Sequence, residues 1–223
     1  MNGSAATDIM APKLLRRALL IAVTTCSLSA GCSQRPAGPR PPNIDAQQSG
    51  EYALELHDSN DDRELDATEL GQIPGILHAL PIYDRDSNGK VSAAEIAARI
   101  LQWRKDDTGL LMLSCVVLLD GRPLEGAHVR LVPEPFLGDE IRVATTTTGR
   151  RGQGLLKLAD EDLPGHLRGL PGVALGIYKV EVTHPTIELP AKYHSATELG
   201  LEVGDDSPEL QGGKFTLRLK SRS

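Results

Sequence analysis

The sequence has little aromatic material. One tryptophan, four tyrosines and two phenylalanines occur among its 223 residues. Any core must therefore be built mainly from Leu, Val, Ile and Ala side chains. The shortage also counts against a carbohydrate-binding surface, because such a surface uses exposed aromatic rings as a platform.

Dense clusters of basic residues are also lacking. The formal net charge is −6, and lysines and arginines occur singly or in isolated pairs. Nucleic acid is therefore not an expected partner, because binding it requires many phosphates to be neutralised. Much of the acidic charge lies between Glu51 and Asp107. A local excess of carboxylates suits a hard divalent cation.

The hydrophobic run near the N-terminus is too short for a permanent transmembrane helix. It covers residues 18–28 and follows a basic region that contains Lys13, Arg16 and Arg17. A short apolar run after basic residues is typical of an export signal. We therefore expect residues 1–31 to be a signal peptide.

Small residues at positions 29–31 lead into Cys32. This segment resembles the lipobox, at which bacterial lipoproteins are cleaved and acylated on the cysteine. One position departs from the pattern, because Ser29 stands where leucine is usual and Leu28 comes one residue earlier. The resemblance implies an exported protein that is attached to a bacterial membrane through lipid on Cys32. Secretion of a soluble chain is the alternative.

The three cysteines provide no disulfide framework. Cys26 lies inside the expected signal peptide and Cys32 would carry lipid, which leaves Cys115 alone. Cys115 belongs to the apolar run 110–119, so we expect a buried and unreactive thiol.

Residues 32–50 are predicted to be a disordered linker. Between Ser33 and Gln48 the chain is rich in Pro, Gly, Gln and Arg, with almost no side chain suited to a core. Such a tether would hold the folded part away from the membrane.

Residues 51–108 have a helical pattern. Apolar residues recur at helical spacing on both sides of two acidic segments. Pro74, Gly75 and Pro81 lie between these segments, so the connecting helices are expected to be short and broken.

The acidic segment at residues 84–95 carries the strongest chemical signal. A calcium loop of twelve residues directs side-chain oxygens inward from its first, third and fifth positions, and a glutamate at the twelfth position closes the site. This segment resembles the EF-hand loop, and Gly89 stands at the sharp turn of that pattern. The ligands that the resemblance implies are Asp84, Asp86, Asn88, the carbonyl oxygen of Lys90, Ser92 and Glu95.

A second segment, at residues 58–69, has the same register. The corresponding ligands are Asp58, Asn60, Asp62, the carbonyl oxygen of Glu64, Asp66 and Glu69. Arg63 stands where glycine is expected, and a left-handed backbone there would cost about 1–2 kcal/mol, so we expect weaker binding. Leu65 matches Val91 in register, and in EF-hand pairs such residues face each other across a short β-bridge. A solvated run of charge is the alternative for this segment.

A sensor movement is not expected from this pair. The connection between the loops is broken by prolines, and the three methionines all lie outside the helical region, whereas sensors use a methionine-rich groove. We expect a structural calcium site or a weak extracellular one, with dissociation constants of roughly 0.1 to 1 mM.

Short β-type runs separated by turns follow Asp107. They cover residues 111–119, 129–132, 141–148, 154–158, 178–183 and 215–219. Several short strands at this spacing predict an antiparallel sandwich. The expected fold is therefore α+β with two domains, a helical domain at residues 51–108 and an all-β domain at residues 109–223.

The segment at residues 116–133 resembles the carboxypeptidase regulatory-like, transthyretin-like family of β-sandwich domains. Residues 176–182 look like the "G-x-Y-x-V" strand of that family, residues 189–193 match the segment that follows it, and residues 215–219 would close the sheet. The resemblance implies a β-sandwich that serves as an interaction module.

Some transthyretin-like proteins are hydrolases, and this raises an enzyme alternative. The chain ends in Lys-Ser-Arg-Ser rather than in the Tyr-Arg-Gly-Ser tail of those enzymes. Four histidines also lack the spacing of metal ligands: His128, His166, His184 and His194. We therefore expect no enzymatic activity.

The preferred hypothesis is a calcium-binding, exported lipoprotein whose β-sandwich contacts a surface protein or a polysaccharide. The alternatives are an adhesion or carbohydrate-binding protein with vestigial EF-hand loops, and a transthyretin-like hydrolase.

Overall fold

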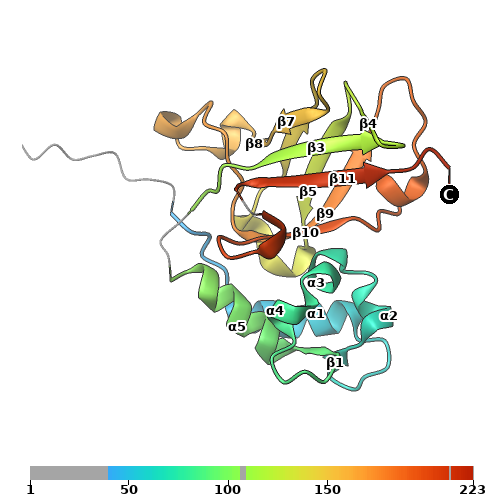
Figure 1. Cartoon of the computed structure of the whole chain (residues 1–223). Coiled ribbons are helices and arrows are strands. Elements are labelled where there is room, and N and C mark those ends of the chain that lie inside the picture. Colours follow the sequence, from blue (N-terminus) through green and yellow to red (C-terminus); the bar gives the residue numbers. More distant parts are fainter. Residues whose placement is uncertain (1–39, 106–108, 211, 223) are drawn as a thin grey trace, which may run out of the picture. The chain divides into compact units, whose positions relative to one another are not determined.

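A computed structural model describes residues 40–105, 109–210 and 212–222 of the chain. The predicted signal peptide, Cys32 and the first part of the predicted linker, residues 32–39, lie outside these residues. The fold is α+β, with the α-helices and two short strands in the first part of the described chain and the other strands in the second (Figure 1). Within the described ranges, no helix has the length and apolar character that a membrane crossing requires.

The described part of the chain has five α-helices, all of them short. Their bounds are α1 (Ala46–His57), α2 (Ala67–Leu70), α3 (Pro74–His78), α4 (Leu80–Tyr83) and α5 (Ala93–Trp103). The predicted interruptions are confirmed, since Pro74 is the first residue of α3 and Pro81 is the second residue of α4. Proline suits the first turn of a helix because the missing amide hydrogen has no partner there.

The end of the predicted linker is ordered, in contrast to our expectation. The helix α1 begins at Ala46 rather than after residue 50. Asp45 caps the helix by accepting a hydrogen bond from the Gln48 amide at 3.0 Å, and such a cap stabilises a helix start. Ile44 is also buried, so this segment has an apolar contact that its overall composition does not reveal.

Eleven strands form three sheets in the described residues. Their bounds are β1 (Glu64–Leu65), β2 (Val91–Ser92), β3 (Ser114–Leu119), β4 (Arg122–Pro123), β5 (His128–Pro133), β6 (Ala144–Thr147), β7 (Gln153–Leu155), β8 (Lys157–Leu158), β9 (Gly176–Thr183), β10 (Gly200–Val203) and β11 (Lys214–Leu219). The strands β1 and β2 pair with each other between the two acidic loops. A five-stranded sheet has the order β10-β9-β5-β6-β8, and in a four-stranded sheet β11 and β4 flank β3, with β7 also paired to β3.

The strand predictions differ from the structure in several places, and β10 was not predicted as a strand. The strand β11 runs parallel to β3, so the sheets are not wholly antiparallel; the long chain between these two strands makes parallel pairing feasible. The predicted run 154–158 is divided at Leu156 between β7 and β8, which belong to different sheets. The predicted strand at 141–148 begins at Ala144, after a 3-10 helix.

Short 3-10 helices occupy several connections. They are η1 (Pro135–Glu140), η2 (Asp160–Asp162), η3 (Gly165–Leu167), η4 (Ala191–Tyr193) and η5 (Pro208–Leu210).

The helical part and the sheets share one hydrophobic core. The helix α3 lies directly against β9 and β10, where a side chain on Gly75 would collide with Ile177 of β9 and one on Gly200 of β10 would collide with the backbone of Gly75. Glycine is needed where two backbones come this close. The predicted domain boundary at residues 107–109 does fall between the last helix and β3, but the described residues on its two sides belong to one compact unit.

Candidate metal site

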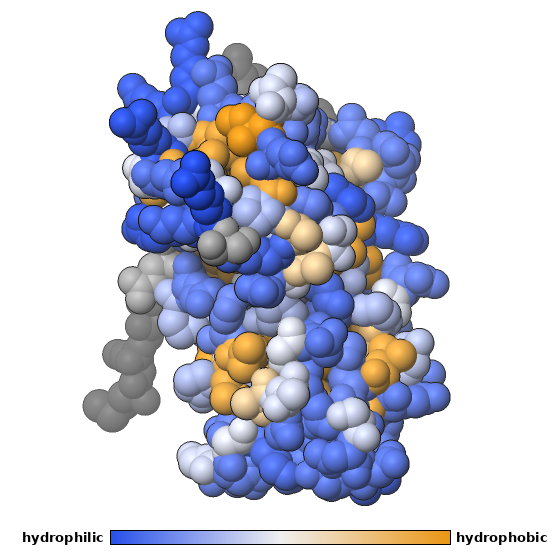
Figure 2. Space-filling model, turned by 90° about the vertical axis from the view of Figure 1, so that its right-hand side faces the viewer, coloured by the Kyte–Doolittle hydropathy of each residue, from blue (hydrophilic) through white to orange (hydrophobic). Residues whose placement is uncertain are grey.

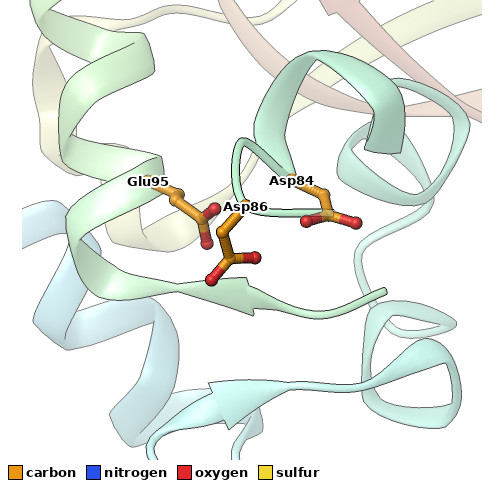
Figure 3. A group of neighbouring side chains, drawn as sticks. All are labelled: Asp84, Asp86 and Glu95. Carbon is orange, nitrogen blue, oxygen red and sulfur yellow. The ribbon is translucent and has the colours of Figure 1, made fainter. Parts of the chain in front are cut away.

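The loop at residues 84–95 connects α4 to α5. Among the described histidine, cysteine, aspartate and glutamate side chains, Asp84, Asp86 and Glu95 form the group able to hold a metal ion, with ligand oxygens that all lie within 4.8 Å of one another. Figure 3 shows the three carboxylates on the loop and on the first turn of α5. Three anionic oxygens from one loop are the donors that a hard divalent cation requires.

Backbone amides hold the first carboxylate of the group in place. The carboxylate of Asp84 accepts hydrogen bonds from the amides of Asn88 at 3.0 Å and Gly89 at 2.9 Å. These bonds require the loop to fold back on its own start. Gly89 allows this with a left-handed backbone at a φ of 81°, a conformation in which glycine has no steric penalty.

Hydrogen bonds also hold the carboxylate of Glu95 in place and favour its ionised form. Its two oxygens accept hydrogen bonds from the amides of Arg85 at 2.8 Å and Ser92 at 2.9 Å. Partial burial opposes ionisation, but the hydrogen bonds from Ser92 and Arg85 outweigh it and lower the pKa of this carboxyl. An ionised carboxylate at the end of the loop is ready to bind a cation.

The other predicted ligands of this loop make contacts of a different kind. Ser92 donates its hydroxyl hydrogen to Glu95 at 2.8 Å and also caps α5. Asn88 accepts a hydrogen bond from the Lys90 amide at 2.8 Å and donates its side-chain amide to Glu64 in the other loop at 2.9 Å.

The loop at residues 58–69, here called the first loop, repeats the backbone of the loop at residues 84–95, here called the second loop. Its fourth and sixth positions, Asp61 and Arg63, have φ values of 58° and 69°, and the corresponding Ser87 and Gly89 have values of 62° and 81°. The sequence predicted the left-handed turn at the sixth position and not the one at the fourth. Aspartate tolerates this conformation better than most residues, and that is the one local signal for the fourth position.

Five side-chain hydrogen bonds also recur at matching positions. In each loop the backbone amide of position six donates a hydrogen bond to the side chain of position one. The amides of positions five and seven donate to the side chains of positions three and five, respectively. The amides of positions two and nine both donate to the side chain of position twelve. In the first loop these bonds are Arg63 to Asp58, Asp62 to Asn60, Glu64 to Asp62, and Ser59 and Asp66 to Glu69. In the second they are Gly89 to Asp84, Asn88 to Asp86, Lys90 to Asn88, and Arg85 and Ser92 to Glu95.

The predicted ligands of the first loop do not converge as those of the second do. Asp58, Asp62, Asp66 and Glu69 do not form a group with metal-ligand spacing among the described residues. The hydrogen bond from the Asp66 amide, together with those from Ser59, lowers the pKa of Glu69 despite its burial. The closing glutamate of this loop is therefore prepared in the same way as Glu95.

The side chain of a lysine in the second loop reaches the acidic side chains of the first loop. The Nζ atom of Lys90 lies 2.6 Å from an oxygen of Asp62 and 3.6 Å from one of Glu64. The hydrogen bond from Lys90 lowers the pKa of Asp62. The sequence assigned Lys90 a role through its carbonyl oxygen alone, because spacing within one loop does not reveal where a long side chain reaches.

The described histidines of the enzyme alternative make local contacts. His184 and His194 border an open hollow of about 620 Å³ that no described arginine lines. Their Nε2 atoms lie 2.8 Å and 3.0 Å from the carbonyl oxygens of Glu125 and Leu189. Each of these two rings therefore has one nitrogen within hydrogen-bonding distance of a main-chain carbonyl.

Comparison with known proteins finds no matching family model, no matching curated protein and no matching solved structure for this chain.

Proposed function

We propose that this chain binds calcium through an EF-hand pair formed by residues 58–69 and 84–95. The observation that carries the proposal is the recurrence of the same hydrogen bonds at five matching positions in two loops that differ in sequence. In the second loop this backbone surrounds three converging carboxylates. Calcium suits an all-oxygen site of this kind, because it accepts six to eight oxygen ligands with flexible geometry.

The pairing of the loops supports the same reading. Leu65 is the direct partner of Val91 in the β1–β2 ladder, and both side chains are fully buried. Two loops joined in this way stabilise each other, because neither strand has another partner among the described residues.

The test is calorimetric titration of calcium into the whole chain and into two variants. Glu95→Gln and Glu69→Gln each remove the closing carboxylate of one loop with little change of volume. We expect Glu95→Gln to lose more affinity, because the second loop has the converging ligands and the glycine turn. Equal losses would contradict this ranking.

Magnesium is the control for ion identity, since it demands a smaller octahedral shell and is expected to bind less tightly. Trp103 is the one tryptophan of the chain and lies on α5 after Glu95, so its fluorescence gives a second signal. Absence of heat, of a fluorescence change and of thermal stabilisation at millimolar calcium would refute the proposal.

The β part is proposed to be a transthyretin-like sandwich that contacts a surface protein or a polysaccharide, without enzymatic activity. A carbohydrate platform is less well supported, because Tyr52 is the one aromatic side chain that is exposed among the described residues. Figure 2 shows a mostly hydrophilic face with hydrophobic side chains in separate patches. A polar contact with a protein partner fits this surface better.

Export and attachment to a bacterial membrane through Cys32 complete the proposal. The expected result for Cys32→Ala is a shift of the protein from the membrane fraction to the soluble fraction. Persistence of the variant in the membrane fraction would contradict lipid attachment at this residue.

A further inference from the structure

A buried ionic network joins α5 to the β part of the chain. Arg99 has 1% of its surface exposed and Glu202, in β10, has 3%. The Nε atom of Arg99 donates to Glu202 at 2.6 Å, and the indole of Trp103 donates to the same carboxylate oxygen at 3.0 Å. Ser207 donates to the other oxygen of Glu202. A charge this deeply buried is stable when its hydrogen bonds are satisfied.

A second carboxylate completes the contacts of the arginine. Asp206 accepts two hydrogen bonds from the Arg99 guanidinium, at 3.0 Å and 2.6 Å. It also accepts one from Gln102 at 2.8 Å. A planar guanidinium held by two carboxylates has a defined position and direction. The helix that carries Arg99 is therefore fixed against the segment 202–207.

This helix also carries the closing carboxylate of the calcium loop. Glu95 and Arg99 are four residues apart on α5, so they lie on neighbouring turns of one face. On the other side of the loop, Tyr83 directly precedes Asp84 and is fully buried in the shared core. Both ends of the loop thus begin from positions that the core holds in place.

We propose that Glu202 and Asp206 are positioning residues for the calcium site in the second loop. They act through Arg99, which fixes α5 and with it the place of Glu95 relative to Asp84 and Asp86. A loop whose closing ligand is already in position loses less conformational freedom on binding the ion. The inference rests on the proposed calcium binding and extends it to residues more than a hundred positions later in the chain.

The coupling runs in both directions. If Asp206 raises the calcium affinity of the loop, then calcium must strengthen the contact of α5 with Asp206 by the same factor. Calcium binding would then hold α5 more firmly against the segment 202–207, although no residue of that segment is a ligand of the ion.

The experiment uses the whole chain with Glu69→Gln, which leaves the second loop as the binding site. Calcium affinity is measured by calorimetry with and without Asp206→Asn. We expect the amide to lower the affinity by roughly fivefold or more, within the usual range of coupling between sites. Asp206 is about half exposed, with 47% of its side-chain surface accessible, so the variant is expected to fold.

Two further variants separate positioning from general damage. Asp206→Glu keeps the carboxylate and is expected to recover most of the affinity. Glu181→Gln removes a partner of Arg130 in a surface ion pair of the β part, at 2.7 Å, and is expected to leave the affinity unchanged. Circular dichroism is used to verify that each protein is folded at the temperature of the titration. A lower melting temperature alone does not change the calcium affinity of a protein that is fully folded at that temperature.

Unchanged affinity in a folded Asp206→Asn protein would overturn the inference and leave the proposed function intact. An absence of calcium binding in the Glu69→Gln parent, together with its absence in the unmodified chain, would overturn both. Glu202→Gln alters the buried carboxylate and is expected to lower the calcium affinity more than Asp206→Asn does.

Discussion

Arg63 and Gly89 hold the same position in the two acidic loops and share a left-handed backbone, with φ values of 69° and 81°. The side chain of Arg63 gains little in return, since it pairs with Glu51 at 3.2 Å and both side chains are mostly exposed. An exposed ion pair of this kind contributes little to stability. The first loop therefore keeps a strained residue that the second loop avoids.

Replacing Arg63 with glycine is expected to stabilise the protein. Relief of the left-handed strain outweighs the greater freedom of glycine in the unfolded chain, and the net gain is about 1 kcal/mol. Urea denaturation measures it. Gly89→Ala is the mirror control: its side chain would meet no atom of the described residues within 4 Å, so the loss expected there comes from the backbone. A gain in stability for both variants would contradict the explanation.

Lys90 is expected to weaken calcium binding in the first loop. Its ammonium group lies 2.6 Å from Asp62, a predicted ligand of that loop, so a cation that binds there must displace it or share the carboxylate. Lys90→Met keeps the length of the side chain and removes the charge. This variant and its control are made in a protein that also carries Glu95→Gln. Calorimetry is expected to show that Lys90→Met raises the calcium affinity of the first loop several times over that of the Glu95→Gln protein with Lys90. Lys192→Met, at a cation–π contact with the buried ring of Tyr193 in the β part, is the control. A weaker first loop in Lys90→Met would show that Lys90 assists binding instead.

The Leu65–Val91 contact is expected to be a main source of stability for the loop pair. Both side chains have no exposed surface, and truncation of a buried leucine to alanine costs about 2–5 kcal/mol. Leu65→Ala should therefore lower the free energy of unfolding in urea by this amount and reduce calcium affinity in both loops. Leu56→Ala, at a residue with 42% exposure, is the control and should cost far less. Loss of affinity in the first loop alone would argue that the loops bind independently.

Glu134 gives the stability of the protein a pH dependence. Both oxygens of this buried carboxyl lack a hydrogen-bond partner among the described residues, and the ammonium of Lys179 lies 3.8 Å away. Burial raises the pKa of Glu134 from 4.5 to about 7, although Lys179 opposes the shift. Between these two pH values the folded protein holds a proton that the unfolded chain releases, so stability falls as the pH rises.

The measurement compares the unmodified protein with Glu134→Gln in urea from pH 4 to pH 8, with calcium removed by a chelator. The stability of the variant relative to the unmodified protein is expected to increase by about 3 kcal/mol over this range. His57 has its pKa lowered by burial and by Lys179, which gives the opposite trend, but it is present in both proteins. A pH-independent difference would show that folding does not shift the pKa of Glu134.

Several features of the candidate site were predictable because they depend on neighbouring residues. The glycine turn and the helix breaks at Pro74 and Pro81 follow from local spacing, and the structure confirms them. The pairing of Leu65 with Val91 was implied by the resemblance of the two loops to an EF-hand pair, and it is also present in the structure. The other left-handed residue of each loop, at position four (Asp61 and Ser87), was not predicted, because the residue preference at that position is weaker.

Other features were not predictable, because they join residues that are far apart in the chain. The strand β10 is short and includes the polar Glu202, so its pattern did not indicate a strand. That glutamate is buried because Arg99 and Trp103 reach it from α5. Nothing in the sequence near residue 202 indicates such a partner.

The sequence by itself determined where two twelve-residue loops lie, which oxygens each offers and where short helices and strands alternate, because these follow from the spacing and conformational preference of adjacent residues. The tertiary structure decided which carboxylates converge, where Lys90 reaches, that β11 pairs parallel to β3 and that α5 is held by Glu202 and Asp206. The physical reason is that burial and charge pairing depend on the whole core, which brings together segments that local preference cannot connect.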